Sequence, residues 1–170
     1  MGPELVLRVA MRYRAVILDD NSTILKVLWS FFDRLGYEVF SFPEPRLCPL
    51  HLLHACPCPA FTHCADVVVS DLHMGDGSGI DFLEQLIQKG CQRPHFALMS
   101  GGFSDEDFAR ASRLGCTLFS KPLDMAQFAK WVEDVERSVP SKRILCDWLQ
   151  KCPPQGYVSS RPSPAVPVRW

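Results

Sequence analysis

Short apolar runs alternate along the chain with longer segments in which apolar residues recur every three or four positions. The runs have the length and the β-branched content that are typical of buried strands. Three consecutive valines before Ser70 are the clearest case. We predict five strands, at residues 14–18, 37–42, 66–70, 95–100 and 117–120.

The segments between these strands have the spacing of amphipathic helices. Their apolar positions, expected to face the core, are Ile24, Val27, Leu28, Phe31 and Leu35; Ile80, Leu83, Leu86 and Ile87; Phe108, Ala111 and Leu114; and Phe128, Trp131 or Val132, Val135 and Val139. Glycines typical of helix ends follow three of them, at Gly36, Gly90 and Gly115. N-terminal capping pairs are predicted at Ser104 with Asp107 and at Asp124 with Gln127. A helix over residues 44–55 would be interrupted near Pro49.

Five repeats of strand and helix predict an α/β domain with one parallel sheet covered on both faces. Right-handed crossovers and short loops favour a doubly wound sheet. A chain of 170 residues suits one well-cored domain. Past Pro140 the periodicity ends and prolines accumulate. We therefore predict an N-terminal extension (residues 1–11), a domain (12–138) and a Pro-rich, partly disordered tail (139–170) in which "CDWLQKC" could form a helical turn.

Composition excludes several classes of function. Apolar residues make up 47% and charged residues 22%, as in an ordinary globular protein. With 18 basic against 19 acidic residues, the charge gives no argument for a nucleic-acid partner or an anionic membrane. No apolar run approaches the length of a spanning helix, and "MGPELVLRVAM" lacks the features of a signal peptide. We expect a cytoplasmic protein.

Eight cysteines are many for this length, and four of them fall between Cys48 and Cys64 together with His51, His54 and His63. A zinc site in this segment is one interpretation. The other is a proline-broken helix and loop with cysteines as small core residues, which the irregular spacing favours. The sequence leaves both open.

The residues that follow the predicted strands carry the candidate chemistry, because open parallel sheets bind ligands outside the carboxyl ends of their strands. They are Asp19, Asp20, Asp71, Ser100 and Lys121, with Gly101 next to Ser100. Three unpartnered carboxylates would raise each other's pKa, and a Mg²⁺ ion would relieve that repulsion. Asp71 could then attack a phosphoryl group while the metal and Lys121 neutralise its oxygens. Taken alone, each of these acids could instead cap a helix.

Four segments, "ILDDNS", "VVVSDLHMGDGSG", "ALMSGG" and "LFSKP", resemble the receiver domain of two-component response regulators in order and spacing. The resemblance covers roughly residues 12–138. It implies a flavodoxin-like fold with strand order 2-1-3-4-5 and a phosphorylation-controlled switch rather than a dedicated enzyme. Its partners would be a histidine kinase or histidine phosphotransfer protein and a downstream protein target, and a homodimer is an option.

The same resemblance implies residue roles. Asp71 would be the phospho-acceptor, and Mg²⁺ (or Mn²⁺) would be held by Asp19, Asp20, Asp71 and the backbone carbonyl of His73. Ser100, Gly101 and Lys121 would contact the phosphoryl group. Phe119 matches an aromatic switch position, although it could equally be a core residue, and the bond before Pro122 would be cis.

The chain departs from the family at Gly75, where proline is usual, and we interpret the glycines after Asp71 as slack in the loop. Two other functions are therefore kept. A haloacid-dehalogenase-like phosphatase would use "DDNST" and carry its phosphate on Asp19, although Asn21 replaces its second acid. A pseudo-receiver would act as a scaffold without phosphorylation.

A second apolar stripe on the first helix consists of Leu25, Trp29 and Phe32. It predicts either a wide core face or a patch where a kinase docks beside the acceptor.

Overall fold

The computed structural model describes residues 13–56, 58, 62–75, 77–91 and 94–146. The predicted N-terminal extension and residues 147–170 of the predicted tail, including most of "CDWLQKC", lie outside this part of the chain.

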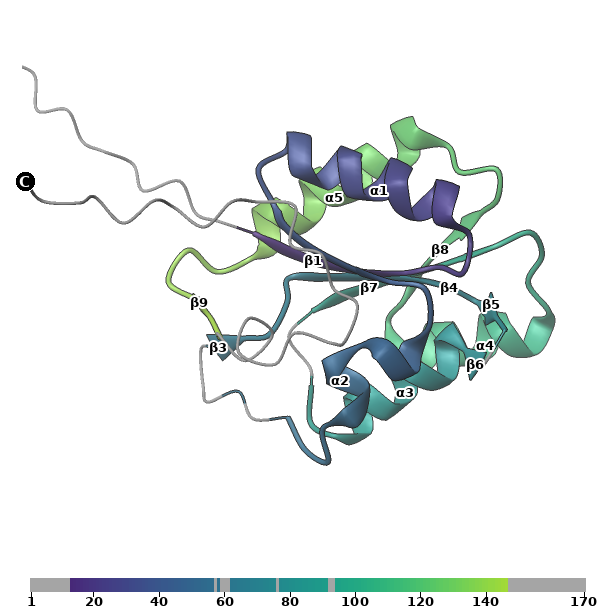
Figure 1. Cartoon of the computed structure of the whole chain (residues 1–170), viewed down its shortest axis with the longest axis horizontal. Coiled ribbons are helices and arrows are strands. Elements are labelled where there is room, and N and C mark those ends of the chain that lie inside the picture. The colour runs from purple at the N-terminus through teal and green to yellow at the C-terminus, as the bar shows by residue number, and fades with distance from the viewer. Residues whose placement is uncertain (1–12, 57, 59–61, 76, 92–93, 147–170) are drawn as a thin grey trace, which may run out of the picture.

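A five-stranded parallel sheet occupies the centre of the described structure (Figure 1). Its strands in spatial order are β2 (Glu38–Phe42), β1 (Arg14–Leu18), β4 (Val67–Asp71), β7 (His95–Ser100) and β8 (Thr117–Ser120). Since β4, β7 and β8 are the third, fourth and fifth strands of this sheet along the chain, the predicted order 2-1-3-4-5 is confirmed. β1 and β4 are buried throughout, as their apolar runs predict.

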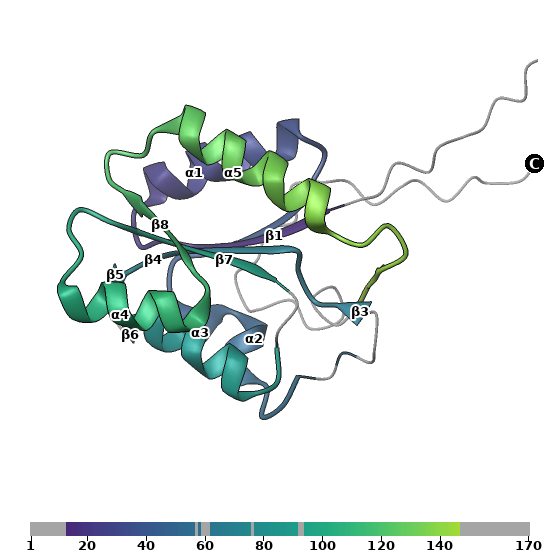
Figure 2. The ribbon, with the colours of Figure 1, turned by 180° about the vertical axis from the view of Figure 1, so that it is seen from behind.

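Helices cover both faces of the sheet. One face carries α1 (Ser22–Arg34) and α5 (Met125–Ser138), and the other carries α2 (Pro49–Leu52), α3 (Gly79–Gln88) and α4 (Asp105–Leu114) (Figures 1 and 2). Both predicted caps form: Ser104 and Asp107 make a capping box, and the Asp124 carboxylate accepts from the backbone N–H groups of Ala126 and Gln127. No described helix is long and apolar enough to cross a membrane.

The orientation of α1 differs from the prediction. Leu28 and Phe32 are its buried residues, whereas Val27 and Leu35, predicted to face the core, are 49% and 50% exposed. The Phe32 ring lies 5.0 Å from the ring of Tyr37 and packs edge-on against the ring of Phe128 in α5. Leu28 and Phe32, four residues apart, therefore lie on the helix face that packs against the sheet. Phe32 is therefore a core residue, and Leu25 and Trp29 are partly buried against the same core, as the predicted wide core face requires. The docking patch at Leu25, Trp29 and Phe32 stays a prediction.

The chain after β2 forms little regular helix. A 3₁₀ turn (η1, Pro45–Leu47) precedes the four-residue α2, and the break falls at Cys48 and Pro49, where an interruption is predicted. Proline lacks the N–H that would continue the helix. α2, with four residues, therefore covers less of the sheet than each of the other helices does.

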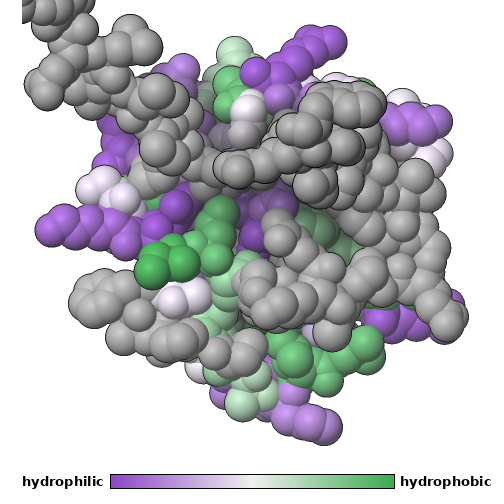
Figure 3. All heavy atoms as spheres, turned by 60° about the vertical axis from the view of Figure 1, so that its left-hand side comes forward, coloured by the Kyte–Doolittle hydropathy of each residue, from purple (hydrophilic) through white to green (hydrophobic). Residues whose placement is uncertain are grey.

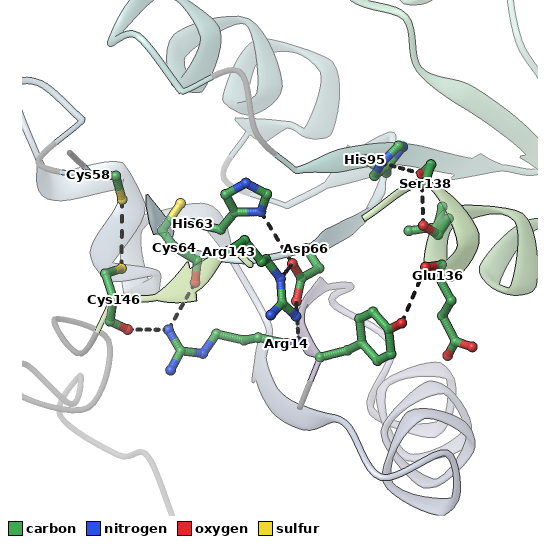
Figure 4. Close-up of polar contacts among 12 residues, drawn as sticks. Arg14, Cys58, His63, Cys64, Asp66, His95, Glu136, Ser138, Arg143 and Cys146 are labelled. Carbon is green, nitrogen blue, oxygen red and sulfur yellow. Dashed lines mark hydrogen bonds and ion pairs between the residues drawn. The ribbon is translucent and has the colours of Figure 1, made fainter. Parts of the chain in front are cut away.

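The chain remains folded beyond Ser138, where the predicted domain ends. β9 (Ile144–Leu145) pairs in parallel with β3 (Thr62–His63). The buried Arg143 guanidinium is ion-paired with Asp66, which is fully buried (Figure 4). Residues 139–146, predicted as the start of the tail, are part of the domain.

Candidate functional site

Three aspartates meet at the carboxyl ends of β1 and β4. Asp19 and Asp20 follow β1, and Asp71 is the last residue of β4. Carboxylate oxygens of the three lie within 4.8 Å of one another. Asp19 is fully buried and Asp71 is 6% exposed, whereas Asp20 is exposed. The predicted grouping of these acids is present, and one side of it is open to solvent.

Lys121 completes the cluster from the loop after β8. Its Nζ donates to Oδ2 of Asp19 at 2.8 Å and to Oδ1 of Asp71 at 2.9 Å. The backbone N–H of Lys121 donates to the carbonyl of Ser100 at 2.7 Å, which fixes the loop to the end of β7. The Lys121–Pro122 peptide bond is cis. The ammonium group therefore bridges the two buried acids.

Burial and charge work against each other at Asp71. Loss of solvent raises the pKa of its carboxyl group, the hydrogen bond from Lys121 lowers it, and the charges of Asp19 and Asp20 raise it again, with a net increase. At Lys121 burial lowers the pKa, but the hydrogen bonds to Asp19 and Asp71 outweigh it and raise the pKa. One lysine leaves the acidic cluster with excess negative charge, which a cation would offset.

Asn21, and not Asp19 or Asp20, caps the N-terminus of α1. The side chain of Asn21, rather than of Asp19 or Asp20, accepts from the backbone N–H groups of Thr23 and Ile24. Asp19 in turn accepts from the backbone N–H of Asn21 at 2.8 Å. The role of Asn21 was missed, although asparagine before a helix is a common cap signal.

Gly79 lets α3 start directly against the end of β4. A Cβ atom there would lie 2.0 Å from the carbonyl oxygen of Asp71 and 2.5 Å from Oγ of Ser70. Between β4 and α3 the chain forms a small hairpin of β5 (His73–Met74) and β6 (Gly77–Ser78). The glycines after Asp71 are therefore not all slack, because Gly79 is required for close approach.

Ser100 and Phe119 lie on neighbouring strands but face different partners. The Ser100 hydroxyl donates to the carbonyl of Gly102 at 2.6 Å and accepts from the N–H of Gly102 at 3.1 Å, so it bonds its own loop. The Phe119 ring is buried and lies 5.2 Å from the ring of Phe128. Its position is that of a core residue, and its role as a switch stays a prediction.

The donor set suits a hard divalent ion. Carboxylate oxygens with solvent access on one side are the ligands that Mg²⁺ prefers. Asp19, Asp20 and Asp71 would hold the ion, while the carbonyl of His73, two residues beyond Asp71, stays a predicted ligand.

Comparison with known families identifies the class of protein. The family model for the response regulator receiver domain matches residues 15–133. The chain belongs to this family, whose members act in two-component signalling, in general as switches rather than dedicated enzymes. None of the curated proteins compared with the chain matches it.

Solved structures show the same fold. The chemotaxis protein CheY4 of Vibrio cholerae is 20% identical, with a TM-score of 0.58 over 73% of this chain and 98% of its own. A response regulator receiver protein from Pseudomonas putida is 20% identical, with a TM-score of 0.61 over 74% and 99% of the two chains. A two-component response regulator from Clostridium difficile is 14% identical, with a TM-score of 0.62 over 74% and 97%.

Proposed function

We propose that Asp71 accepts a phosphoryl group from a histidine kinase or a histidine phosphotransfer protein in a Mg²⁺-dependent reaction. The observation that supports this most directly is the contact of the Asp71 carboxylate with Lys121 at 2.9 Å, inside the three-aspartate cluster. The negative charges of Asp19 and Asp20 next to Asp71 favour binding of a cation at this position.

The reaction is a displacement at phosphorus. A carboxylate oxygen of Asp71 forms the new P–O bond as the P–N bond of the phosphohistidine breaks, and the imidazole leaves as the neutral ring after taking up a proton. Mg²⁺, when bound, supplies positive charge to the phosphoryl oxygens. Lys121, already 2.9 Å from Asp71, would shift its hydrogen bond to a phosphoryl oxygen. Ser100 would leave Gly102 to bind another.

Acetyl phosphate and Mg²⁺ provide the test, with intact mass as the readout. The wild-type chain should gain the mass of one phosphoryl group, and Asp71→Asn should gain none. Asp134→Asn is the matched control, because Asp134 lies exposed on α5 and only pairs with Arg137. An adduct that survives Asp71→Asn and disappears in Asp19→Asn would support the phosphatase mechanism instead. Absence of any adduct would support the pseudo-receiver.

The phosphodonor is proposed to dock on α1 through residues other than those first predicted. Val27, Phe31 and Leu35 line a groove with Met125, the first residue of α5. α1 begins two residues after Asp20 and Met125 follows Lys121 by four, so the groove is built from two helices that start next to the site. A histidine donor presenting an apolar helix would fit this position. Val27→Glu should slow transfer from a phosphorylated histidine protein and leave labelling by acetyl phosphate unchanged.

The output is proposed to pass through a downstream protein partner, as receiver domains in general imply. A homodimer and a cytoplasmic location stay predictions.

A further inference from the structure

Five cysteines gather at the end of the sheet opposite the aspartates. They are Cys56, Cys58, Cys64, Cys91 and Cys146. Cys64 lies between β3 and β4, Cys91 precedes β7, and Cys146 follows β9, so all three belong to the amino-terminal edge of the sheet. Residues far apart in the sequence are thus brought together by the fold.

Sulfur atoms of this cluster contact one another directly. Sγ of Cys64 lies 3.5 Å from Sγ of Cys91. Sγ of Cys58 lies 3.7 Å from Sγ of Cys146, as Figure 4 shows. Cys56, Cys64 and Cys91 also line one small cavity, and Cys58 lies two residues after Cys56 in the same loop.

Two pairs of sulfurs in the cluster have the spacing found in a tetrahedral metal site. Four sulfurs around one zinc ion at the usual Zn–S distance of about 2.3 Å are about 3.8 Å apart along each edge. The Cys64–Cys91 separation of 3.5 Å and the Cys58–Cys146 separation of 3.7 Å are close to that value. Both are far longer than a disulfide bond of about 2.05 Å.

The cysteine cluster borders a small cavity, and hydrogen bonds fix the backbone of the cysteines. A small cavity of about 10 Å³ is lined by Cys56, Cys64 and Cys91 together with leucines and Lys89. The Cys56 N–H donates to the carbonyl of Lys89 at 2.7 Å, which ties the loop after α2 to the end of α3. The buried Arg14 guanidinium donates to the carbonyls of Cys64 and Cys146 (Figure 4). The thiols are positioned by contacts that do not involve their sulfurs.

We propose that Cys56, Cys58, Cys64 and Cys91 bind one Zn²⁺ ion. Thiolates are soft ligands, and a tetrahedral set of four is typical of structural zinc. The ligand set differs from the segment between Cys48 and Cys64 considered from the sequence, since Cys91 replaces the histidines. His63, whose Nδ1 lies 3.3 Å from Asp66, and the fully buried Cys48 are not assigned as ligands.

The ion would stabilise the segment around the short helix α2, where the fold has little regular structure among the described residues. α2 has four residues, and the described residues between Leu53 and Cys64 have little regular structure apart from β3. On the side where β3 and β9 come forward, hydrophobic described residues reach the surface between hydrophilic ones (Figure 3). Zinc would link three segments: the loop after α2 through Cys56 and Cys58, the segment before β4 through Cys64, and the loop before β7 through Cys91. Structural zinc sites supply folding free energy in this way.

The test is metal content of the full chain, purified under reducing conditions, loaded with Zn²⁺ and freed of excess metal. We expect about one zinc per chain by elemental analysis. With Co²⁺ in its place, the protein should show a thiolate-to-cobalt charge-transfer band and the intense visible bands of tetrahedral cobalt. Cys91→Ser and Cys56→Ser should each lose the metal and these bands. Cys56 is only half-buried, so its variant keeps the measurement informative if Cys91→Ser fails to fold.

Cys116→Ser is the matched control, because Cys116 is also half-buried but belongs to the turn before β8. It should retain one zinc per chain. Three results would overturn the proposal: no uptake of Zn²⁺ or Co²⁺ by the reduced wild type, undiminished binding in Cys56→Ser and Cys91→Ser, or iron in place of zinc. Labelling of Asp71 by acetyl phosphate is not part of this readout, so the zinc proposal and the proposed function fail separately.

Discussion

At the scale of single residues, the site depends on a carboxylate held where its charge is unfavourable. Burial is the largest cause of the raised pKa of Asp71; the hydrogen bond from Lys121 lowers the pKa, and the charges of Asp19 and Asp20 raise it. A positive charge next to the Asp71 carboxylate would stabilise its ionised form. Mg²⁺ binding and phosphorylation would both change the net charge at Asp71.

Asp71→Asn should raise the thermal stability of the metal-free domain at neutral pH. Since the folded pKa of Asp71 lies above its unfolded value, the folded state binds its proton more tightly, and the wild type loses stability as pH rises through that pKa. The variant lacks this loss, so its gain in melting temperature should grow between acidic and neutral pH. Thermal unfolding in EDTA at several pH values measures it. Asp134→Asn should show no such trend, and a gain independent of pH would contradict the electrostatic cause.

Gly79→Ala should destabilise the domain and weaken phosphorylation together. The added Cβ would meet the Asp71 carbonyl at 2.0 Å, so either α3 or the end of β4 must move. Overpacking of this kind costs about 1–3 kcal/mol. Urea unfolding gives the free energy, and acetyl phosphate labelling reports the position of Asp71. Gly77→Ala is the control, because nothing lies within 4 Å of a Cβ at Gly77. Equal effects of the two substitutions would count against the close-approach explanation.

The grouping of Asp19, Asp20, Asp71 and Lys121 could be predicted from the sequence because it follows from topology. Parallel strands bring their carboxyl ends to one edge, so polar residues at those ends meet whatever the packing details. Gly79 and the Ser100 hydroxyl could not be predicted, since their contacts depend on sub-ångström placement of backbone. The sequence indicated only the part of the thiol cluster that lies between Cys48 and Cys64. Cys91 and Cys146 could not be predicted as members, because they join it from distant loops.

At the scale of elements, strands were predicted more accurately than helix faces. A buried strand such as β4 is apolar on both faces. It can therefore be recognised as a strand from its sequence even when the face that each side chain occupies is not known. α1 is apolar over much of its circumference, and periodicity alone did not distinguish Leu28 and Phe32 from Val27 and Leu35. The aromatic contact of Phe32 with Tyr37, which follows the helix, decided the face.

The segment after α5 should contribute measurably to stability. A chain ending at Ser138 would leave Asp66 buried without the Arg143 guanidinium, and removing one partner of a buried ion pair costs about 3–5 kcal/mol. Urea unfolding of chains ending at Ser138 and at Cys146 makes the comparison, and the second keeps every described contact. Equal midpoints would show that residues 139–146 pack without stabilising the domain.

At the scale of the whole molecule, the two ends of the sheet carry different chemistry. The carboxyl ends hold hard oxygen ligands around Asp71, and the amino ends hold soft sulfur ligands around Cys64. β4 has five residues and separates them by about 17 Å at the rise of an extended strand. Sites at this separation with no shared partner usually contribute independently to stability.

Mg²⁺ should therefore stabilise the domain by the same amount whether or not the thiol cluster is intact. A ligand that binds only the folded state adds RT ln(1 + [L]/Kd), about 2.7 kcal/mol at a hundredfold excess over Kd. We expect the same Mg²⁺-induced rise in melting temperature for wild type and for Cys56→Ser, although the second starts from a lower value. Asp20→Asn, which removes an exposed ligand without disturbing the Lys121 contacts, should lose most of the rise. A Mg²⁺ effect that disappears in Cys56→Ser would show instead that the amino-terminal edge controls the geometry of the aspartates, because the strands between them would then transmit the change.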